Sequence, residues 1–253
     1  GGRHQQSRAA SVSPLEGVPM QRNGSRSPAT TAAPTVTTTT PTSPCRPPGG
    51  PACCCCRRSS ASTATSARWP SSTRSTVSSC WRPTCSWREA PRVELGYAGA
   101  ERERAMQLLA QADRSQLAAD LATSLAALSA RPECAGRVGA RLHCMGGRLA
   151  YLAAAGGGID AVSCYYGGGI QDQLEYAPRI ACPIQFHYGE RDAHIPMGAV
   201  EKVKAAFAGR ADAEFHLYDA EHGFNCWERA SYHAPSSARA HARTLELFAR
   251  TLF

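Results

Sequence analysis

The first 86 of the chain's 253 residues contain almost no large aliphatic and almost no acidic side chains: one Leu, no Ile, no Phe, and Glu16 as the single acid. Ser, Thr, Pro, Arg and Gly make up most of this segment, which includes a Thr run at 37–40. A segment of this composition cannot bury a hydrophobic core, so we predict that residues 1–86 are disordered and that a folded domain spans residues 87–253.

The basic charge of the chain is confined to the same segment. Residues 1–86 carry ten Arg, no Lys and one acid, a charge of +9, whereas the other 18 basic and 19 acidic residues leave residues 87–253 at −1. The folded part therefore shows no charge signal for nucleic acid or a membrane. A flexible basic arm is one interpretation of residues 1–86. An RNA-binding or mucin-like tail is another, and it predicts a steep salt dependence of binding, although its Arg are not interleaved with aromatic residues.

A third interpretation of this segment is a frame-shifted translation. Back-translated with suitably chosen synonymous codons and regrouped one base earlier, residues 53–69 can be read as LLLQEIFGVNRHIRAV, and residues 75–86 as LDGFVVLAPDLF. Both readings contain apolar, strand-like runs that the written segment lacks. This hypothesis predicts that residues up to about 86 replace the normal N-terminal half of an α/β domain, and the coding DNA would test it.

Long apolar runs and metal-type cysteine spacings are also lacking. No stretch is long enough to span a bilayer, and no apolar signal-peptide core is present, so we expect a cytoplasmic protein with reduced thiols. Seven of the twelve cysteines lie within residues 1–86, and the four consecutive ones at 53–56 fit no common zinc spacing. We therefore expect no disulfide framework, no metal and no cofactor.

From Trp87 onward, helical patterns alternate with strand patterns. Leucines three to four residues apart predict one or two helices over 100–128, ended by Pro132. Further extended segments are predicted at 136–143, 159–166, 183–188 and 214–218, and further helices at 149–155, 197–208 and 236–253. This alternation predicts an α/β fold with a parallel sheet covered by helices on both faces.

A small-residue turn at 144–147, Cys-Met-Gly-Gly, joins one extended segment to a helix. Such a turn can present the Cys144 thiol at the tip of a strand, with the backbone N–H of Met145 facing a developing oxyanion. The positive end of the following helix would lower the pKa of this thiol from about 8.5, which nucleophilic attack requires. The alternative for Cys144 is an ordinary buried thiol.

A candidate acid and a candidate base follow in the chain. Asp192 ends Gly-Glu-Arg-Asp and His222 begins His-Gly-Phe, each after a predicted strand. The order nucleophile, acid, histidine is that of α/β-hydrolases. We expect His222 to share a proton with Cys144, and Asp192 to hold the imidazole in the required tautomer. Taken singly, Asp192 also fits a helix N-cap before Met197, and His222 a surface residue.

Four segments carry a more specific pattern: CMGGRLA at 144–150, YYGGGI at 165–170, HYGERDAHIP at 187–196 and HGF at 222–224. Together they resemble the dienelactone hydrolase (carboxymethylenebutenolidase) family over residues 87–253. The resemblance implies a three-layer α/β-hydrolase fold with a mainly parallel sheet. Because residues 1–86 lack apolar runs, we expect the N-terminal strands of that sheet to be missing or disordered.

The same resemblance assigns roles to single residues. It implies Cys144 as nucleophile, His222 as base and Asp192 as the acid that orients it. It also implies that Arg102 holds a substrate carboxylate, for which the alternative is a solvated helix face. The predicted function is hydrolysis of a small enol-lactone or ester by a monomer or weak oligomer. A catalytically impaired, truncated or frame-shifted homologue with exposed sheet edges is the alternative.

Three departures from the family pattern bear on activity. Leu142 stands where the family usually has Gly, and we expect it to crowd the turn. Cys226 stands where some members have Arg, with Arg229 nearby. The family's QEIFG glutamate, and the neighbouring N–H that completes the oxyanion hole, are absent from the written chain. In the shifted frame, that glutamate would span the codons of residues 57 and 58. We therefore expect the chain as written to be a weaker enzyme than its family.

Overall fold

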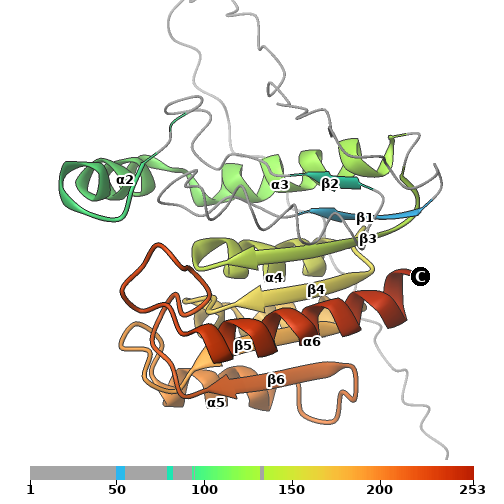
Figure 1. The fold of residues 1–253 in the computed structure, drawn as a ribbon. Helices are drawn as coiled ribbons and strands as arrows, with labels where there is room; N and C mark the ends of the chain where they lie inside the picture. The colour runs from blue at the N-terminus through green and yellow to red at the C-terminus, as the bar shows by residue number, and fades with distance from the viewer. Residues whose placement is uncertain (1–49, 55–78, 82–92, 94, 132–133) are drawn as a thin grey trace, which may run out of the picture. The chain divides into compact units, whose positions relative to one another are not determined.

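Six parallel strands form one sheet in the order β2-β1-β3-β4-β5-β6 (Figure 1). The strands are β1 (Gly50–Cys54), β2 (Ser79–Trp81), β3 (Cys134–His143), β4 (Ala161–Tyr165), β5 (Ile184–Gly189) and β6 (Ala213–Tyr218). The computed structural model describes residues 50–54, 79–81, 93, 95–131 and 134–253. All of these residues belong to one unit of the chain, residues 36–253.

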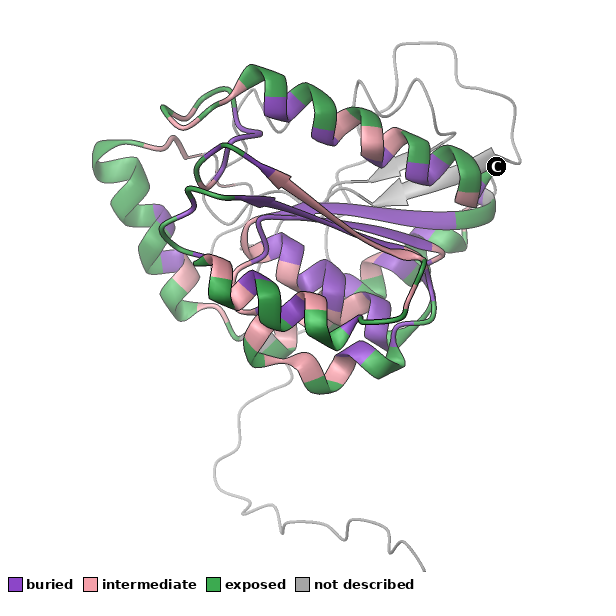
Figure 2. Ribbon diagram, turned by 90° about the horizontal axis from the view of Figure 1, so that it is seen from below, coloured by how far each residue is buried: buried purple, intermediate pink, exposed green. Residues whose placement is uncertain are grey.

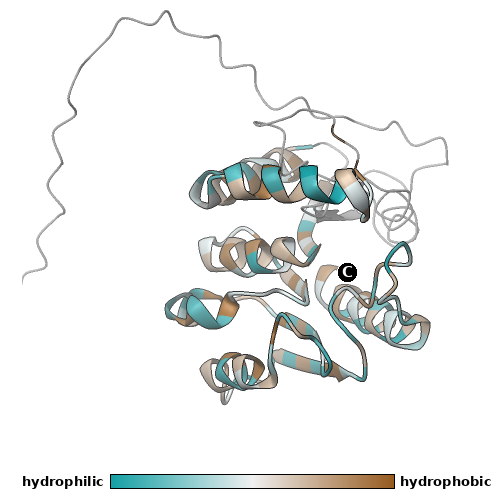
Figure 3. Cartoon of the chain, turned by 90° about the vertical axis from the view of Figure 1, so that its left-hand side faces the viewer, coloured by the Kyte–Doolittle hydropathy of each residue, from teal (hydrophilic) through white to brown (hydrophobic). Residues whose placement is uncertain are grey.

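Helices cover both faces of this sheet. They are α2 (Gly99–Gln111), α3 (Arg114–Ser129), α4 (Met145–Gly156), α5 (Met197–Ala206) and α6 (Ala234–Leu252), with short 3₁₀ turns η1 (Ile170–Asp172) and η2 (Leu174–Arg179). The helix α6 lies on one face, and α3, α4 and α5 lie on the other (Figure 3). The predicted three-layer α/β fold is confirmed. Within the described residues, no helix is both long and apolar enough to cross a bilayer.

The leucine pattern over 100–128 resolves into two helices. Asp113 begins α3 because its side chain accepts hydrogen bonds from the backbone N–H groups of Ser115 and Gln116. Of the six leucines in this pattern, Leu109 is half-buried, and the other five are buried: Leu108, Leu117, Leu121, Leu125 and Leu128. The helix α3 ends at Ser129, and Pro132 lies outside the described residues.

The central strands are buried on both sides, as expected for parallel strands between two helix layers. Every residue of β4 and β5 is buried, whereas β6, at the edge of the sheet, is half-buried (Figure 2). The outer faces of the helices are exposed (Figure 2). The continuous apolar runs in the sequence therefore mark the centre of the sheet.

The N-terminal strands differ from the prediction, which expected them to be missing or disordered. Strands β1 and β2 both pair in parallel with the rest of the sheet, and β1 lies next to β3. A sheet ladder consists of backbone N–H and C=O groups, so it can form without the apolar side chains on which the prediction relied. The register of β1 against β3 shifts between Gly50 and Ala52, where Pro51 has no N–H to donate.

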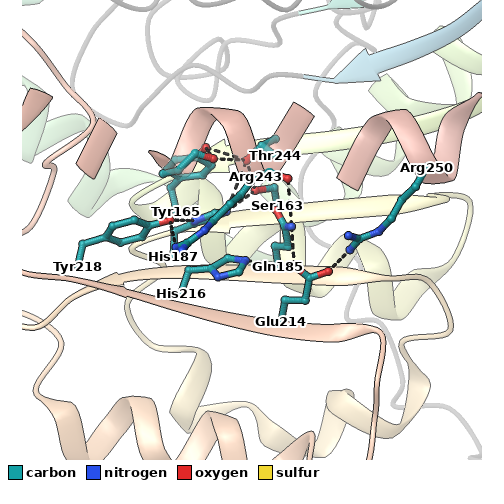
Figure 4. A network of polar contacts seen from close by, with 11 residues as sticks. Ser163, Tyr165, Gln185, His187, Glu214, His216, Tyr218, Arg243, Thr244 and Arg250 are labelled. Carbon is teal, nitrogen blue, oxygen red and sulfur yellow. Dashed lines mark hydrogen bonds and ion pairs between the residues drawn. The ribbon is translucent and has the colours of Figure 1, made fainter. Parts of the chain in front are cut away.

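The sheet face under α6 is unusually polar (Figure 4). His187 is fully buried there between the hydroxyls of Ser163 and Tyr218, with nitrogen–oxygen distances of 3.1 and 2.9 Å. The Thr244 hydroxyl of α6 lies 2.9 Å from that of Ser163 and 2.7 Å from that of Tyr165. This face therefore contacts α6 through paired polar groups, and we call Ser163, Tyr165, His187, Tyr218 and Thr244 the α6 network.

Candidate active site

Cys144 lies between the end of β3 and the start of α4. Its backbone has φ 57° and ψ −124°, a positive φ that is rare outside glycine. The Cys144 N–H donates to the Tyr165 carbonyl (2.9 Å), and the Cys144 carbonyl accepts from the Gly147 N–H (2.9 Å). These bonds hold a strained strand-to-helix turn that presents the thiol at the carboxyl edge of the sheet.

Glycine at position 147 lets α4 begin this close to the sheet. A Cβ added to Gly147 would lie 2.8 Å from the Tyr165 carbonyl oxygen and 3.0 Å from the Gly167 Cα, both too close for a side chain. The turn forms although Leu142 stands two residues before the cysteine. Leu142 is fully buried in the main core, in register with Cys164 of β4.

His222 joins the thiol to a carboxylate. Its Nε2 lies 3.3 Å from the Cys144 Sγ, and its Nδ1 lies 2.7 Å from the Asp192 Oδ2. The Asp192 side chain is fully buried, while that of His222 is 12% exposed and so remains accessible from one side. The structure thus brings the three predicted side chains into one hydrogen-bonded chain.

Asp192 is held by the turn that contains it. Its Oδ1 accepts the backbone N–H groups of His194 (2.8 Å) and Ile195 (3.2 Å), which leaves Oδ2 for His222. The residue at the N-cap of α5 is Pro196, so Asp192 is not the cap of that helix. The carboxylate therefore has two fixed oxygens, each directed to a different partner.

The loop after β6 is tied to the loop after β5. The Ala220 carbonyl accepts the Arg191 N–H (3.1 Å), and a Cβ on Gly189 would lie 2.2 Å from the Ala220 carbonyl oxygen. The Ser231 hydroxyl donates to the His222 carbonyl (2.7 Å). These contacts fix the histidine backbone relative to the acid, because only glycine at 189 allows so close an approach.

The electrostatics favour a shifted proton between Cys144 and His222. Burial alone would raise the pKa of Cys144, but the hydrogen bond and charge of His222, the Met145 N–H and the charge of Arg229 outweigh burial and lower it. Burial would likewise lower the pKa of His222, yet the hydrogen bonds and charges of Asp192 and Cys144 raise it to about 9. Both shifts stabilise a thiolate beside an imidazolium.

The two remaining predicted site residues lie in different settings. The backbone N–H of Met145 is directed at the Cys144 sulfur, at the start of α4. Arg102 lies exposed on α2, and within the described part of the chain its side chain makes no hydrogen bond or ion pair. Its role in substrate binding stays a prediction.

Two charged or titratable residues near the site were not assigned a role from the sequence. The Arg229 guanidinium lies 5.0 Å from the Tyr97 ring centroid and against Gly223, next to His222. The exposed His194 ring lies edge-on to His222, with centroids 5.0 Å apart. In the sequence, His194 is part of the HYGERDAHIP motif, and Arg229 lies near Cys226, where some family members have Arg.

The described residues hold no group of three or more metal-type ligands. Of the five cysteines from residue 134 onward, Cys144 alone is half-exposed, while Cys134, Cys164, Cys182 and Cys226 are buried, and all five are free thiols. The chemistry that these residues can perform is therefore that of a thiol, an imidazole and a carboxylate.

The chain is similar in sequence to a known family of proteins. Residues 94–252 match the model of the dienelactone hydrolase family. The chain is 32% identical over 171 residues to carboxymethylenebutenolidase 1 of Cupriavidus pinatubonensis, covering 67% of this chain and 73% of that protein. It is 31% identical over 169 residues to the carboxymethylenebutenolidase of Pseudomonas sp. strain P51, covering 66% and 71%.

Solved structures show the same fold. A dienelactone hydrolase-like promiscuous phosphotriesterase from metagenomic libraries superposes with a TM-score of 0.68 at 17% identity, over 82% of this chain and 89% of that one. Est1E from Butyrivibrio proteoclasticus superposes with a TM-score of 0.57 at 9% identity, over 80% and 90%. With the family model matching more than half of its residues, this chain belongs to the dienelactone hydrolase family and is a hydrolase.

Proposed function

We propose that the protein hydrolyses a small enol-lactone or ester through Cys144 as nucleophile, His222 as acid and base, and Asp192 as the orienting carboxylate. The observation that carries this proposal is the unbroken contact from Sγ to Nε2 and from Nδ1 to Oδ2, at 3.3 and 2.7 Å. The similarity to carboxymethylenebutenolidases supports the choice of substrate class. A catalytically impaired homologue would not need this geometry, so the active form is the better interpretation.

The reaction begins with attack of the Cys144 thiolate on the carbonyl carbon. The electron pair of the C=O bond moves to oxygen, and the Met145 N–H at the start of α4 stabilises that oxyanion. Collapse of the tetrahedral adduct breaks the bond to the leaving oxygen, which takes a proton from the His222 imidazolium. The product of this step is a thioester on Cys144 and the free alcohol or enol end of the substrate.

Water then hydrolyses the thioester and releases the acyl part of the substrate as a carboxylic acid. His222, now neutral, accepts a proton from the attacking water while Asp192 stabilises the imidazolium that forms. The second adduct collapses with the Cys144 thiolate as leaving group, which restores the starting pair. For a substrate that carries a carboxylate, Arg102 is the residue that the family resemblance assigns to bind it. The family's second oxyanion-hole donor is absent from the chain as written, so the Met145 N–H is the donor that this proposal uses.

The reactivity of the thiol tests this proposal directly. Iodoacetamide labelling of the full chain at neutral pH, mapped by mass spectrometry, should modify Cys144 at least about 10-fold faster than Cys182. Cys182 is the control because burial raises its pKa to about 11. Equal rates at the two cysteines would contradict an activated thiolate. Absence of ester hydrolysis by the enzyme before iodoacetamide treatment would contradict the proposed reaction.

A further inference from the structure

Tyr166, the first residue after β4, has the second unusual backbone of the site. Among the described residues other than glycine, it and Cys144 alone have a positive φ, +36° for Tyr166. This conformation is costly for a bulky side chain and is kept only when the surroundings enforce it. Here the Tyr166 N–H donates to the His187 carbonyl (2.8 Å), which holds the turn in place.

This backbone directs the Tyr166 ring to the histidine of the site. The ring is 1% exposed, and its centroid lies 5.1 Å from that of His222 with the two planes at 61°. The Tyr166 ring also packs against the rings of Phe224 and Tyr165, with centroid distances of 5.4 and 6.2 Å. Because those neighbours are buried, the Tyr166 ring cannot move away from the imidazole without disturbing the core.

His222 needs such a contact at one stage of the reaction in particular. In the resting site, its ring is held at both nitrogens, by Asp192 and by Cys144. Once Cys144 becomes a thioester, the sulfur no longer accepts a hydrogen bond from Nε2, and Asp192 alone would leave the ring free to tilt about the remaining bond. An aromatic ring packed against the imidazole would keep Nε2 directed at the attacking water.

We propose that Tyr166 is a positioning residue that holds the His222 imidazole in line through ring packing, with its largest effect on the hydrolysis of the thioester. The inference rests on the proposed function for its kinetic consequence. The contacts with His222, Phe224 and Tyr165 are made by the ring, so phenylalanine at this position should preserve them. The positive φ of Tyr166 is the backbone conformation that directs its ring at His222.

Two substitutions separate the ring from the backbone. Tyr166→Phe keeps the ring, and Tyr166→Asn removes it while tolerating a positive φ. With p-nitrophenyl acetate as probe, Tyr166→Phe should stay within about twofold of the parent, whereas Tyr166→Asn should lower kcat by about 10- to 100-fold. Because thioester hydrolysis follows acylation, KM should fall together with kcat, so kcat/KM should change much less than kcat. The thioester of Tyr166→Asn should accumulate as an initial burst. Should the Asn variant not fold, Tyr166→Gly takes its place.

A second readout does not depend on turnover. The pH at which iodoacetamide labelling of Cys144 reaches half its maximal rate should move upward in Tyr166→Asn, since a tilted His222 stabilises the thiolate less. Phe186→Leu is the control: Phe186 is fully buried against Phe207 and Phe215, with centroids 5.2 and 4.7 Å away. This variant should lose stability but keep the labelling profile and kcat of the folded enzyme.

The positioning role of Tyr166 and the proposed function are contradicted by different results. Unchanged kcat and labelling in a folded Tyr166→Asn, an equal loss in Phe186→Leu, or an equal loss in Tyr166→Phe would each overturn the positioning role. A parent enzyme with no Cys144-dependent hydrolysis would sink the proposed function, and the labelling profile would still decide whether Tyr166 positions His222.

Discussion

His222 and His187 each connect two side chains through their ring nitrogens, but the two imidazoles differ in partner and in exposure. His222 lies between a thiol and a buried carboxylate, and its pKa is raised to about 9. His187 lies between the hydroxyls of Ser163 and Tyr218, and complete burial, together with the charges of nearby basic groups, holds its pKa well below 6.5. Folding therefore favours the protonated form of His222 and the neutral form of His187.

This difference follows from the partner at Nδ1. A carboxylate stabilises the charged imidazolium, so His222 can hold and return a proton, whereas a phenol hydroxyl offers no compensating charge. Partial exposure of the His222 side chain also gives a substrate access to the thiol, and the α6 network is closed by Thr244 and the rest of α6 (Figure 4). Similar geometry therefore supports chemistry in one place and packing in the other.

The largest difference between the two sites is expected when the Cys144 thiol and the Ser163 hydroxyl are each removed. Cys144→Ala should lower the rate of ester hydrolysis by at least about 10⁴-fold, because the described residues place no other nucleophile against the Nε2 of His222. Ser163→Ala, the matched change in the α6 network, should leave kcat of the folded protein unchanged. A steady-state assay of both variants decides the point, and comparable activity in Cys144→Ala would contradict the assignment.

Asp192 and Tyr218, the Nδ1 partners of His222 and His187, should also differ in their effect on activity. Asp192→Asn should lower kcat on the order of 10³-fold, since the amide cannot stabilise the imidazolium and favours the wrong tautomer. It should also raise the pH needed to label Cys144, because the pKa of His222 falls. Tyr218→Phe is the matched control in the α6 network and should change neither quantity. An Asp192→Asn variant with the parent labelling profile would argue against the triad.

Acid should destabilise the protein through the α6 face. His187 and its neighbour His216 stay neutral in the folded state: burial and the charge of Arg243 also lower the pKa of His216 to about 4. In the unfolded chain both titrate near 6.5, so the unfolded state binds more protons below that pH. Stability should therefore be full above pH about 6.5 and fall as the pH drops, by up to about 1.4 kcal/mol per unit for each histidine.

Urea unfolding between pH about 7 and 5 measures this effect, in a window above the titration of ordinary carboxylates. The variant His216→Gln should show a shallower slope than the parent. The two groups of the candidate site change stability in opposite directions. The contribution of His222 is complete below pH about 6.5 and is lost as the pH rises through about 9, while that of Cys144 grows with pH because its pKa is lowered. A flat urea midpoint from pH about 7 to 5 would refute the buried-histidine account.

The smallest expected effect is the loss of one hydroxyl under α6. Thr244→Val removes the partner that Ser163 and Tyr165 share, at 2.9 and 2.7 Å. This change should lower the free energy of unfolding by about 1–3 kcal/mol, because buried hydroxyls lose hydrogen bonds. The kcat of the folded enzyme should not change, and a drop in kcat would show that the α6 network reaches the active site.

The sequence anticipated the elements that local patterns specify. The leucine spacing of α3 and the apolar runs of β4 and β5 depend on short-range periodicity, and their positions agree with the structure within a few residues. The strands β1 and β2 were not anticipated, because their pairing with the sheet uses backbone groups that composition does not reveal. Tyr166 lies in the YYGGGI motif and Arg229 was named beside Cys226, but no role could be assigned to Tyr166, since an aromatic after a strand has no diagnostic pattern.

By itself, the chain's order of residues determined the α/β class, the strained turn at Cys144 and the candidates Asp192 and His222, because each depends on neighbours a few positions away. Only the folded sheet decided that residues 78 and 30 positions apart meet at 3.3 and 2.7 Å, that Arg102 lies exposed, and that His187 is sealed while His222 is not. The physical reason is that contact, burial and pKa are set by which strands lie side by side, and that arrangement is a property of the whole sheet.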